Sequence, residues 1–173
     1  MTSTISSNKV AVKWSLISVI VSIVLTYTYQ FLNIDQSSGV KYIGLIPYIA
    51  FMFLAQKEYK DLIVYPTFGQ SFMTGFKYVI ITLVLGSIFT YIYWTLLSPQ
   101  IFQALVDTAK QQAEAKGAEL PAIFTSAGFY IILGAIFSLI TGIIIALIGA
   151  AIFKKDKPPF ATDENVPYSD PAV

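Results

Sequence analysis

Four long apolar runs constrain this chain more than any other feature of its sequence. They cover residues 14–32, 40–56, 78–97 and 129–153. Three of them are long enough to cross a hydrocarbon core, which needs about 20 helical residues. The second run is marginal and contains Pro47, which a membrane helix tolerates when its neighbours satisfy the freed carbonyl. The sequence therefore predicts an all-α polytopic membrane protein, with four transmembrane helices arranged as two hairpins.

Composition agrees with this class and excludes several kinds of chemistry. Hydrophobic residues make up 55% of the chain and charged residues 12%, which is more apolar surface than a soluble domain of 173 residues can bury. The chain has no cysteine and no histidine, and all eleven of its basic residues are lysine. The commonest general base, thiol ligands and the two-point arginine clamp are therefore missing. We expect no catalytic residue, no cofactor, no metal site and no nucleic-acid partner.

The distribution of lysines predicts the orientation of the spans. With four spans and the N-terminus inside, eight lysines are cytoplasmic, whereas Lys41, Lys110 and Lys116 lie outside. Residues 1–13 are then a cytoplasmic N-terminus. Residues 154–173, which are rich in proline, form a disordered cytoplasmic tail, with a short partner-binding segment as the alternative. Aromatic residues fall at the predicted outer interface, as in an aromatic belt: Tyr27, Tyr29, Tyr42, Tyr91, Tyr93, Trp94 and Tyr130.

The segment after the third run predicts an amphipathic helix over residues 99–116. Ser98 is a candidate cap and Pro99 suits the first helical position. Gly117 and Pro121 then end the element. The helix lies either on the outer membrane surface or over the bundle, and a simple connector is the alternative. The apolar residues that recur at helical spacing are Ile101, Phe102, Leu105, Val106 and Ala109.

The segment at residues 67–77 predicts an interfacial start to the third helix. Thr67 and Gln70 have the spacing of a capping box directly after Pro66. Continuing the helix places three phenylalanines on one side and a candidate polar inner-face surface on another. That surface is a hypothetical site for an anionic headgroup, a metabolite or a partner carboxylate, and the alternative is a cap followed by a membrane anchor. Its residues are Thr67, Gln70, Thr74 and Lys77.

The fourth run carries small residues every four positions, which is typical of a face where helix backbones approach closely. This predicted helix-packing face consists of Gly134, Ser138, Gly142, Ala146 and Ala150. The first and third runs also match at an offset of 64 residues, with Lys13 and Trp14 aligned on Lys77 and Tyr78. The match indicates either a parallel repeat of two hairpins or convergence on the same interface residues.

Two stretches resemble the bacterial family called domain of unknown function 4199. The first is YKDLIVYPTFGQSFMTGF and the second is FTYIYWTLLSPQIFQ. The resemblance implies a small inner-membrane protein with four helices, hence a location in the bacterial inner (cytoplasmic) membrane, and it implies no known activity, substrate or catalytic residue. Its motif positions are Phe68, Gly69, Gln70, Phe72 and Gly75, followed by Tyr91, Tyr93, Pro99 and Phe102.

Two functions are compatible with these features. The leading hypothesis is a scaffold, accessory or regulatory subunit without catalytic activity, which acts through helix contacts with a membrane-protein partner or a second copy within the lipid bilayer. The alternative is an oligomeric transporter or channel for a small solute. The two-hairpin repeat favours the alternative, whereas the absence of Asp, Glu and His from the four runs opposes it.

Overall fold

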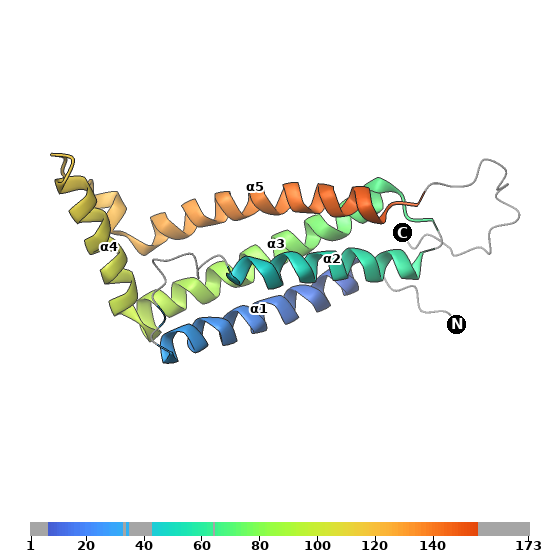
Figure 1. The fold of residues 1–173 in the computed structure, drawn as a ribbon, viewed down its shortest axis with the longest axis horizontal. Helices are drawn as coiled ribbons and strands as arrows, with labels where there is room; N and C mark the ends of the chain where they lie inside the picture. The colour runs from blue at the N-terminus through green and yellow to red at the C-terminus, as the bar shows by residue number, and fades with distance from the viewer. Residues whose placement is uncertain (1–6, 33, 35–42, 64, 156–173) are drawn as a thin grey trace, which may run out of the picture. The chain divides into compact units, whose positions relative to one another are not determined.

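The computed structural model describes residues 7–32, 34, 43–63 and 65–155, and every regular element in that part of the chain is helical (Figure 1). The predictions for residues 1–6, Lys41, Tyr42 and 156–173, including most of the tail, lie outside the described residues. The five α-helices are α1 (Ser7–Phe31), α2 (Leu45–Leu62), α3 (Phe68–Ile92), α4 (Pro99–Glu114) and α5 (Ala127–Phe153). A π-helical turn η2 (Tyr93–Leu97) follows α3, and a 3-10 turn η3 (Ala122–Thr125) precedes α5.

Within the described residues, three helical segments are long and apolar enough to cross a membrane. They are Ser7–Phe31 with 25 residues, Phe68–Leu97 with 30 residues and Ala127–Phe153 with 27 residues. The α2 helix is shorter, with 18 residues, and its last turns contain Lys57, Glu58, Lys60 and Asp61. By length and composition, the structure therefore has three of the four predicted membrane helices, and α2 falls outside that class.

Pro47 causes no break in α2. The helix begins at Leu45, so the proline lies in the first turn, where backbone N–H groups have no intrahelical partner. A proline at such a position removes no helix hydrogen bond. The sequence placed Pro47 inside a span that begins at residue 40, whereas the structure places it at the start of a helix that continues to Leu62.

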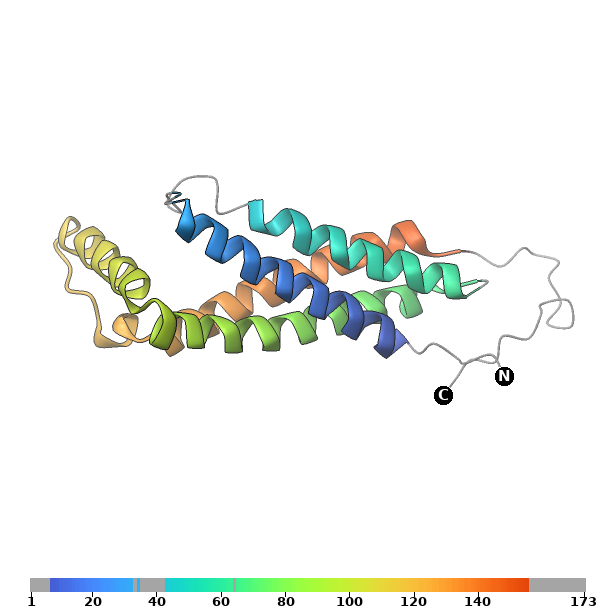
Figure 2. The same cartoon turned by 90° about the horizontal axis from the view of Figure 1, so that it is seen from below.

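The chain divides into two compact units. Unit 1 consists of Met1–Thr82 and Thr141–Val173, and unit 2 consists of Leu83–Ile140. In unit 1, α1 and α2 run antiparallel and lie side by side in both views (Figures 1 and 2). Their contact includes a small apolar cluster in which Val10 of α1 meets Ala55 and Tyr59 of α2. The start of α1 therefore packs against the end of α2.

In unit 2, α4 packs through the apolar face that the sequence indicates. The ring of Phe102 lies between Trp94 of η2 and Tyr130 of α5, with centroid distances of 5.5 Å and 5.9 Å. Val106, one turn further along α4, is buried. The element predicted for residues 99–116 is thus a helix that packs on the adjoining elements of unit 2 and does more than connect them.

The two ends of α4 are formed mainly by backbone groups. At the start, the Ser98 side chain makes no cap hydrogen bond, contrary to expectation, and the Ile101 N–H bonds the Ser98 carbonyl instead. At the end, Gly117 has a φ of 69°, which favours glycine. This turn lets the Ala118 N–H reach back to the Ala113 carbonyl at 3.0 Å, in the manner of a Schellman motif.

Candidate functional site: a buried polar cluster around Gln56 and Tyr78

The side chain of Gln56 joins three helices of unit 1. Gln56 lies on α2 and is fully buried. Its Nε2 donates to the Ser71 carbonyl of α3 at 3.1 Å and to the Ala146 carbonyl of α5 at 2.9 Å. A buried amide is costly unless it is hydrogen bonded. Both N–H bonds of this amide are therefore used between helices that are far apart in the sequence.

Two glycines make room for the Gln56 amide. A Cβ atom on Gly75 of α3 would lie 2.5 Å from Nε2, and one on Gly149 of α5 would lie 1.8 Å from Oε1. Oε1 has no hydrogen-bond donor among the described residues. Since a Cα–Cβ bond measures about 1.5 Å, this oxygen lies within about 3.3 Å of the Gly149 Cα, so the amide packs directly against the glycine backbone.

A second set of polar groups surrounds Tyr78 of α3, which is also buried. Its hydroxyl lies 2.8 Å from Ser18 Oγ of α1 and 3.0 Å from the Tyr48 carbonyl of α2. One phenol proton serves one acceptor, so the arrangement that satisfies these groups has Tyr78 donating to the carbonyl and Ser18 donating to the phenol oxygen. Ser15 Oγ donates to the Tyr78 backbone carbonyl at 3.2 Å. Hydroxyl groups thus connect α1, α2 and α3.

The predicted helix-packing face of α5 is closely packed in one half and less closely packed in the other. A Cβ atom on Gly142 would lie 2.7 Å from both Tyr48 Oη and Val79 Cγ1, and Ala146 and Ala150 are fully buried. These three residues pack inside unit 1. Within residues 83–140, by contrast, a Cβ atom on Gly134 would meet no atom within 4 Å, and Ser138 is half-buried.

In the structure, the four residues of the predicted polar surface form hydrogen bonds within unit 1. The Thr67 N–H donates to Gln70 Oε1 at 3.0 Å, and the Gln70 N–H donates to Thr67 Oγ1 at 3.3 Å, so the predicted capping box is present. Thr74 is fully buried and bonds the Gln70 carbonyl. Lys77 is half-buried and donates to Ser7 Oγ at 2.8 Å. Thr67 and Gln70 are exposed and Lys77 is half-buried, whereas Thr74 turns into the bundle and takes no part in an exposed surface.

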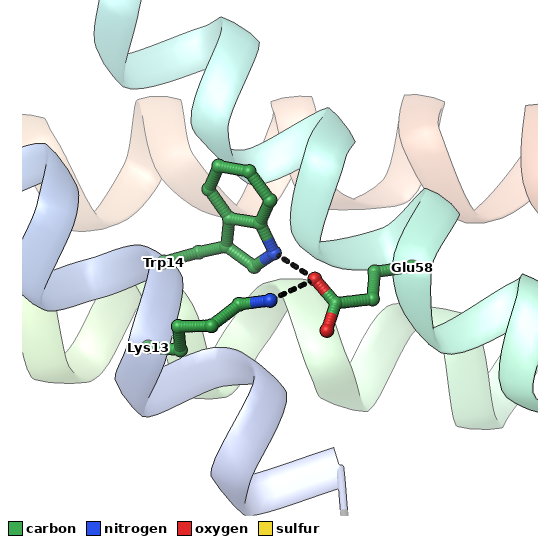
Figure 3. A network of polar contacts seen from close by, with 3 residues as sticks. All are labelled: Lys13, Trp14 and Glu58. Atoms are coloured by element: carbon green, nitrogen blue, oxygen red, sulfur yellow. Dashed lines mark hydrogen bonds and ion pairs between the residues drawn. The ribbon is translucent and has the colours of Figure 1, made fainter.

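A polar contact at the same end of unit 1 fastens α1 to α2 (Figure 3). Glu58 Oε2 forms an ion pair with the Lys13 ammonium and accepts a hydrogen bond from Trp14 Nε1 at 2.7 Å. The Lys13 ammonium also lies 5.0 Å from the centroid of the Trp14 ring. Burial by itself raises the pKa of the Glu58 carboxyl, but hydrogen bonds from Lys13 and Trp14 and the Lys13 charge outweigh burial. The pKa therefore lies below its ordinary value.

Sequence reasoning overlooked Gln56 and Glu58. Gln56 ends the second apolar run and Glu58 follows it, and polar residues at such positions ordinarily mark the limit of a span. The one available signal for Gln56 was an uncharged amide directly before the charged residues that end α2. Gly149 was also overlooked, because it lies one position away from the four-residue spacing of the predicted face.

Apolar helices of membrane-spanning length, with polar side chains bonded between helices, are features of a membrane-embedded helical protein. The chain belongs to the family described as "Protein of unknown function (DUF4199)", which matches residues 13–155 and confirms the resemblance seen in the sequence. The matched range includes the whole polar cluster. No match is found among curated proteins, and none among solved structures.

Proposed function

We propose that this chain is a four-span protein of the bacterial inner membrane, with both termini cytoplasmic, that works as a scaffold, accessory or regulatory subunit without catalytic activity. In this proposal it acts through contacts between its helices and those of another membrane protein or a second copy of itself. The family has no described activity that could support the proposal. The support for the proposed function therefore comes from packing and charge.

The antiparallel packing of α1 and α2 supports a fourth span. Val10 and Lys13 near the start of α1 contact Tyr59 and Glu58 near the end of α2. Once α1 has crossed the membrane, the chain returns to the side where it began only if the α2 region crosses as well. The helix is short, but its apolar part ends at Gln56, whose polar atoms are enclosed between α3 and α5.

The observation that carries the proposed function is the unequal use of the small-residue face of α5. Its Gly142–Ala150 half is filled by neighbouring helices of unit 1. In its other half, a Cβ atom on Gly134 would meet nothing within 4 Å and Ser138 is half-buried; Gly86 of α3 is open in the same way as Gly134. Lipid covers exposed apolar side chains readily, but small residues four positions apart favour another helix backbone at close range. We therefore place the partner contact on the Gly134 half.

Native mass spectrometry of particles extracted from the membrane in a lipid-preserving polymer tests this proposal. The wild-type particle should contain a second chain, and Gly134→Leu should lose it without lowering the melting temperature. Gly142→Leu should instead destabilise the chain itself, because its side chain would collide with Val79 and Tyr48. Ile132→Ala alters an exposed residue on the opposite side of α5 and serves as the control. A wild-type particle that contains a single chain would contradict the proposal.

A second candidate, a transporter or channel for a small solute, is favoured by the hydroxyl groups of Ser15, Ser18 and Tyr78 inside the bundle. If these groups line a path in an open state, Tyr78→Phe should reduce solute flux into proteoliposomes while the melting temperature changes little. Absence of flux through the wild-type protein for a panel of small polar solutes would remove this candidate.

A further inference from the structure

At one end of unit 1, α1 and α3 begin and α2 and α5 end (Figures 1 and 2). Lysines of α1, α2 and α3, and the two lysines directly after α5, belong to this end. We call this set the lysine collar. Five of its members are exposed, and Lys60 and Lys77 are half-buried. The members are Lys9, Lys13, Lys57, Lys60, Lys77, Lys154 and Lys155.

Contacts of three members join the elements at this end of unit 1. The Lys155 N–H donates to the Pro66 carbonyl at 3.0 Å, which joins the end of α5 to the turn before α3. The Lys60 ammonium lies 5.7 Å from the centroid of the Phe153 ring. Lys77 reaches Ser7 at the start of α1. The collar is therefore a feature of the folded unit and does not appear in any single segment.

The collar carries a large excess of positive charge. Among the described residues of unit 1, seven lysines face two carboxylates, Glu58 and Asp61, which leaves five positive charges in excess. Glu58 is already engaged by Lys13, whereas Lys77 and Lys60 contact a neutral hydroxyl and an aromatic ring. Unit 2 has the opposite balance, with two lysines against Asp107, Glu114 and Glu119.

We propose that the lysine collar binds the headgroups of anionic phospholipids and selects them over zwitterionic ones. Each lysine has a long apolar stem that can lie along a helix while its ammonium reaches the headgroup level. A compact ammonium is a suitable point charge for phosphate. A zwitterionic headgroup brings its own cation, whereas an anionic headgroup supplies net negative charge to the excess lysines of the described part of unit 1.

This inference rests on the proposed membrane span of the helices, which places the collar at headgroup level, and it does not depend on any protein partner. It also differs from the sequence-based site at residues 67–77, because Lys77 is the one residue that the two sets share. The other six lysines of the collar come from α1, from α2 and from the two residues directly after α5.

Lipid binding by the purified, delipidated full-length protein in neutral detergent tests the proposal. Phosphatidylglycerol and phosphatidylcholine with identical acyl chains are titrated separately, and bound lipids are counted by native mass spectrometry. We expect tighter binding of phosphatidylglycerol, which weakens as salt increases. The double variant Lys60→Gln/Lys155→Gln should weaken phosphatidylglycerol binding by roughly 10- to 30-fold and leave phosphatidylcholine binding unchanged.

Two further variants keep the test decisive. Lys110→Gln/Lys116→Gln removes the same charge from unit 2 and should leave lipid selectivity intact. Lys60→Arg/Lys155→Arg keeps the charge and should bind phosphatidylglycerol like the wild type, which separates loss of charge from loss of folding. The melting temperature of each variant without added lipid provides the folding reference.

Three results would overturn the proposal. Equal affinity of the wild type for the two lipids would remove the selectivity. An equal loss of binding in the unit 2 control would show a diffuse charge effect without a site. Displacement of bound lipid by soluble glycerol phosphate at a similar concentration would identify the occupant as a free anion. None of these results bears on the particle mass in native membranes, which tests the proposed subunit role separately.

Discussion

The side chain of Gln56 fills the space that glycine leaves open at two positions on two other helices. Its Nε2 is on the Gly75 side and its Oε1 is on the Gly149 side. The two carbonyls that it bonds lie on the same two helices. Glycine at these positions is thus explained by a close side-chain approach and needs no unusual backbone conformation.

Gly149→Ala should destabilise the protein because the added methyl group would displace the Gln56 amide and break its hydrogen bonds. Phe53 Cδ1 would also lie 3.1 Å from the new Cβ, which limits relaxation. We expect a loss of about 1–3 kcal/mol of unfolding free energy, measured as a lower melting temperature in detergent. Gly86→Ala makes the same change at an open helical position and should be neutral or stabilising.

If Gly149→Ala and Gly86→Ala had the same melting temperature, the amide would be mobile enough to accept a neighbour, and its role as an interhelical link would be refuted.

At the scale of elements, the first turns of α3 are stabilised by residues that lie close together in its own sequence. Thr67 and Gln70 bond each other's backbone N–H groups, and Phe68, Phe72 and Phe76 stack along the following turns with centroid distances of 6.5 Å and 5.9 Å. Both patterns are local, since each bond or contact joins residues three or four positions apart. This locality is why the sequence predicted both patterns correctly.

Thr67→Ala should cost about 1 kcal/mol of stability, because the first turn of α3 loses one side of its capping box. Amide hydrogen exchange at residues 68–71 should speed up, and the melting temperature should fall slightly. Thr28→Ala removes a threonine hydroxyl that bonds within a helix, to the Val24 carbonyl, and should have little effect. Gln70→Ala should resemble Thr67→Ala, and a double variant with fully additive losses would argue against a reciprocal box.

The contact between α1 and α2 should weaken in acid. The pKa of Glu58 lies below the ordinary value of 4.5, so its ionised carboxylate stabilises the fold at neutral pH, and this contribution is lost as the pH falls through the folded-state pKa. The side chains of Lys13 and Glu58 are 49% and 31% exposed, so we expect a loss below about 1 kcal/mol.

Melting temperatures of the wild type and Glu58→Gln between pH 7 and pH 3 test this expectation. The variant should be less stable at pH 7, and the difference should shrink as the pH falls below 4.5. A difference that stays constant over this range would show that the charge of Glu58 does not contribute.

For the whole molecule, the central question is how many times the chain crosses the membrane. The chain contains no cysteine, so an introduced cysteine is unique. In the four-span proposal, Lys9→Cys and Lys57→Cys should react with an impermeant maleimide from the same side of the membrane, and Lys110→Cys from the other side. The labelling of intact cells and inverted vesicles measures this directly. Reaction of Lys9→Cys and Lys57→Cys from opposite sides would refute a crossing by α2.

The sequence by itself determined the all-α class, the three long apolar helices, the start of α3 and the family. The class, the helices and the start of α3 depend on hydropathy over about 20 residues or on bonds within one helical turn, and the family was recognised from two short stretches of sequence. Residues near in sequence decide such features, so they can be recognised before any fold is known.

Only the tertiary structure decided which polar and small residues form hydrogen bonds or pack between helices. Gln56 bonds a carbonyl 90 residues away, Thr74 is buried although it was expected on a surface, and the α5 face is filled at Gly142 but open within unit 2 at Gly134. The same residue type at the same helical spacing occurs in both situations. What differs is the neighbouring helix, and contacts between helices that are distant in the chain have no local pattern from which they can be read.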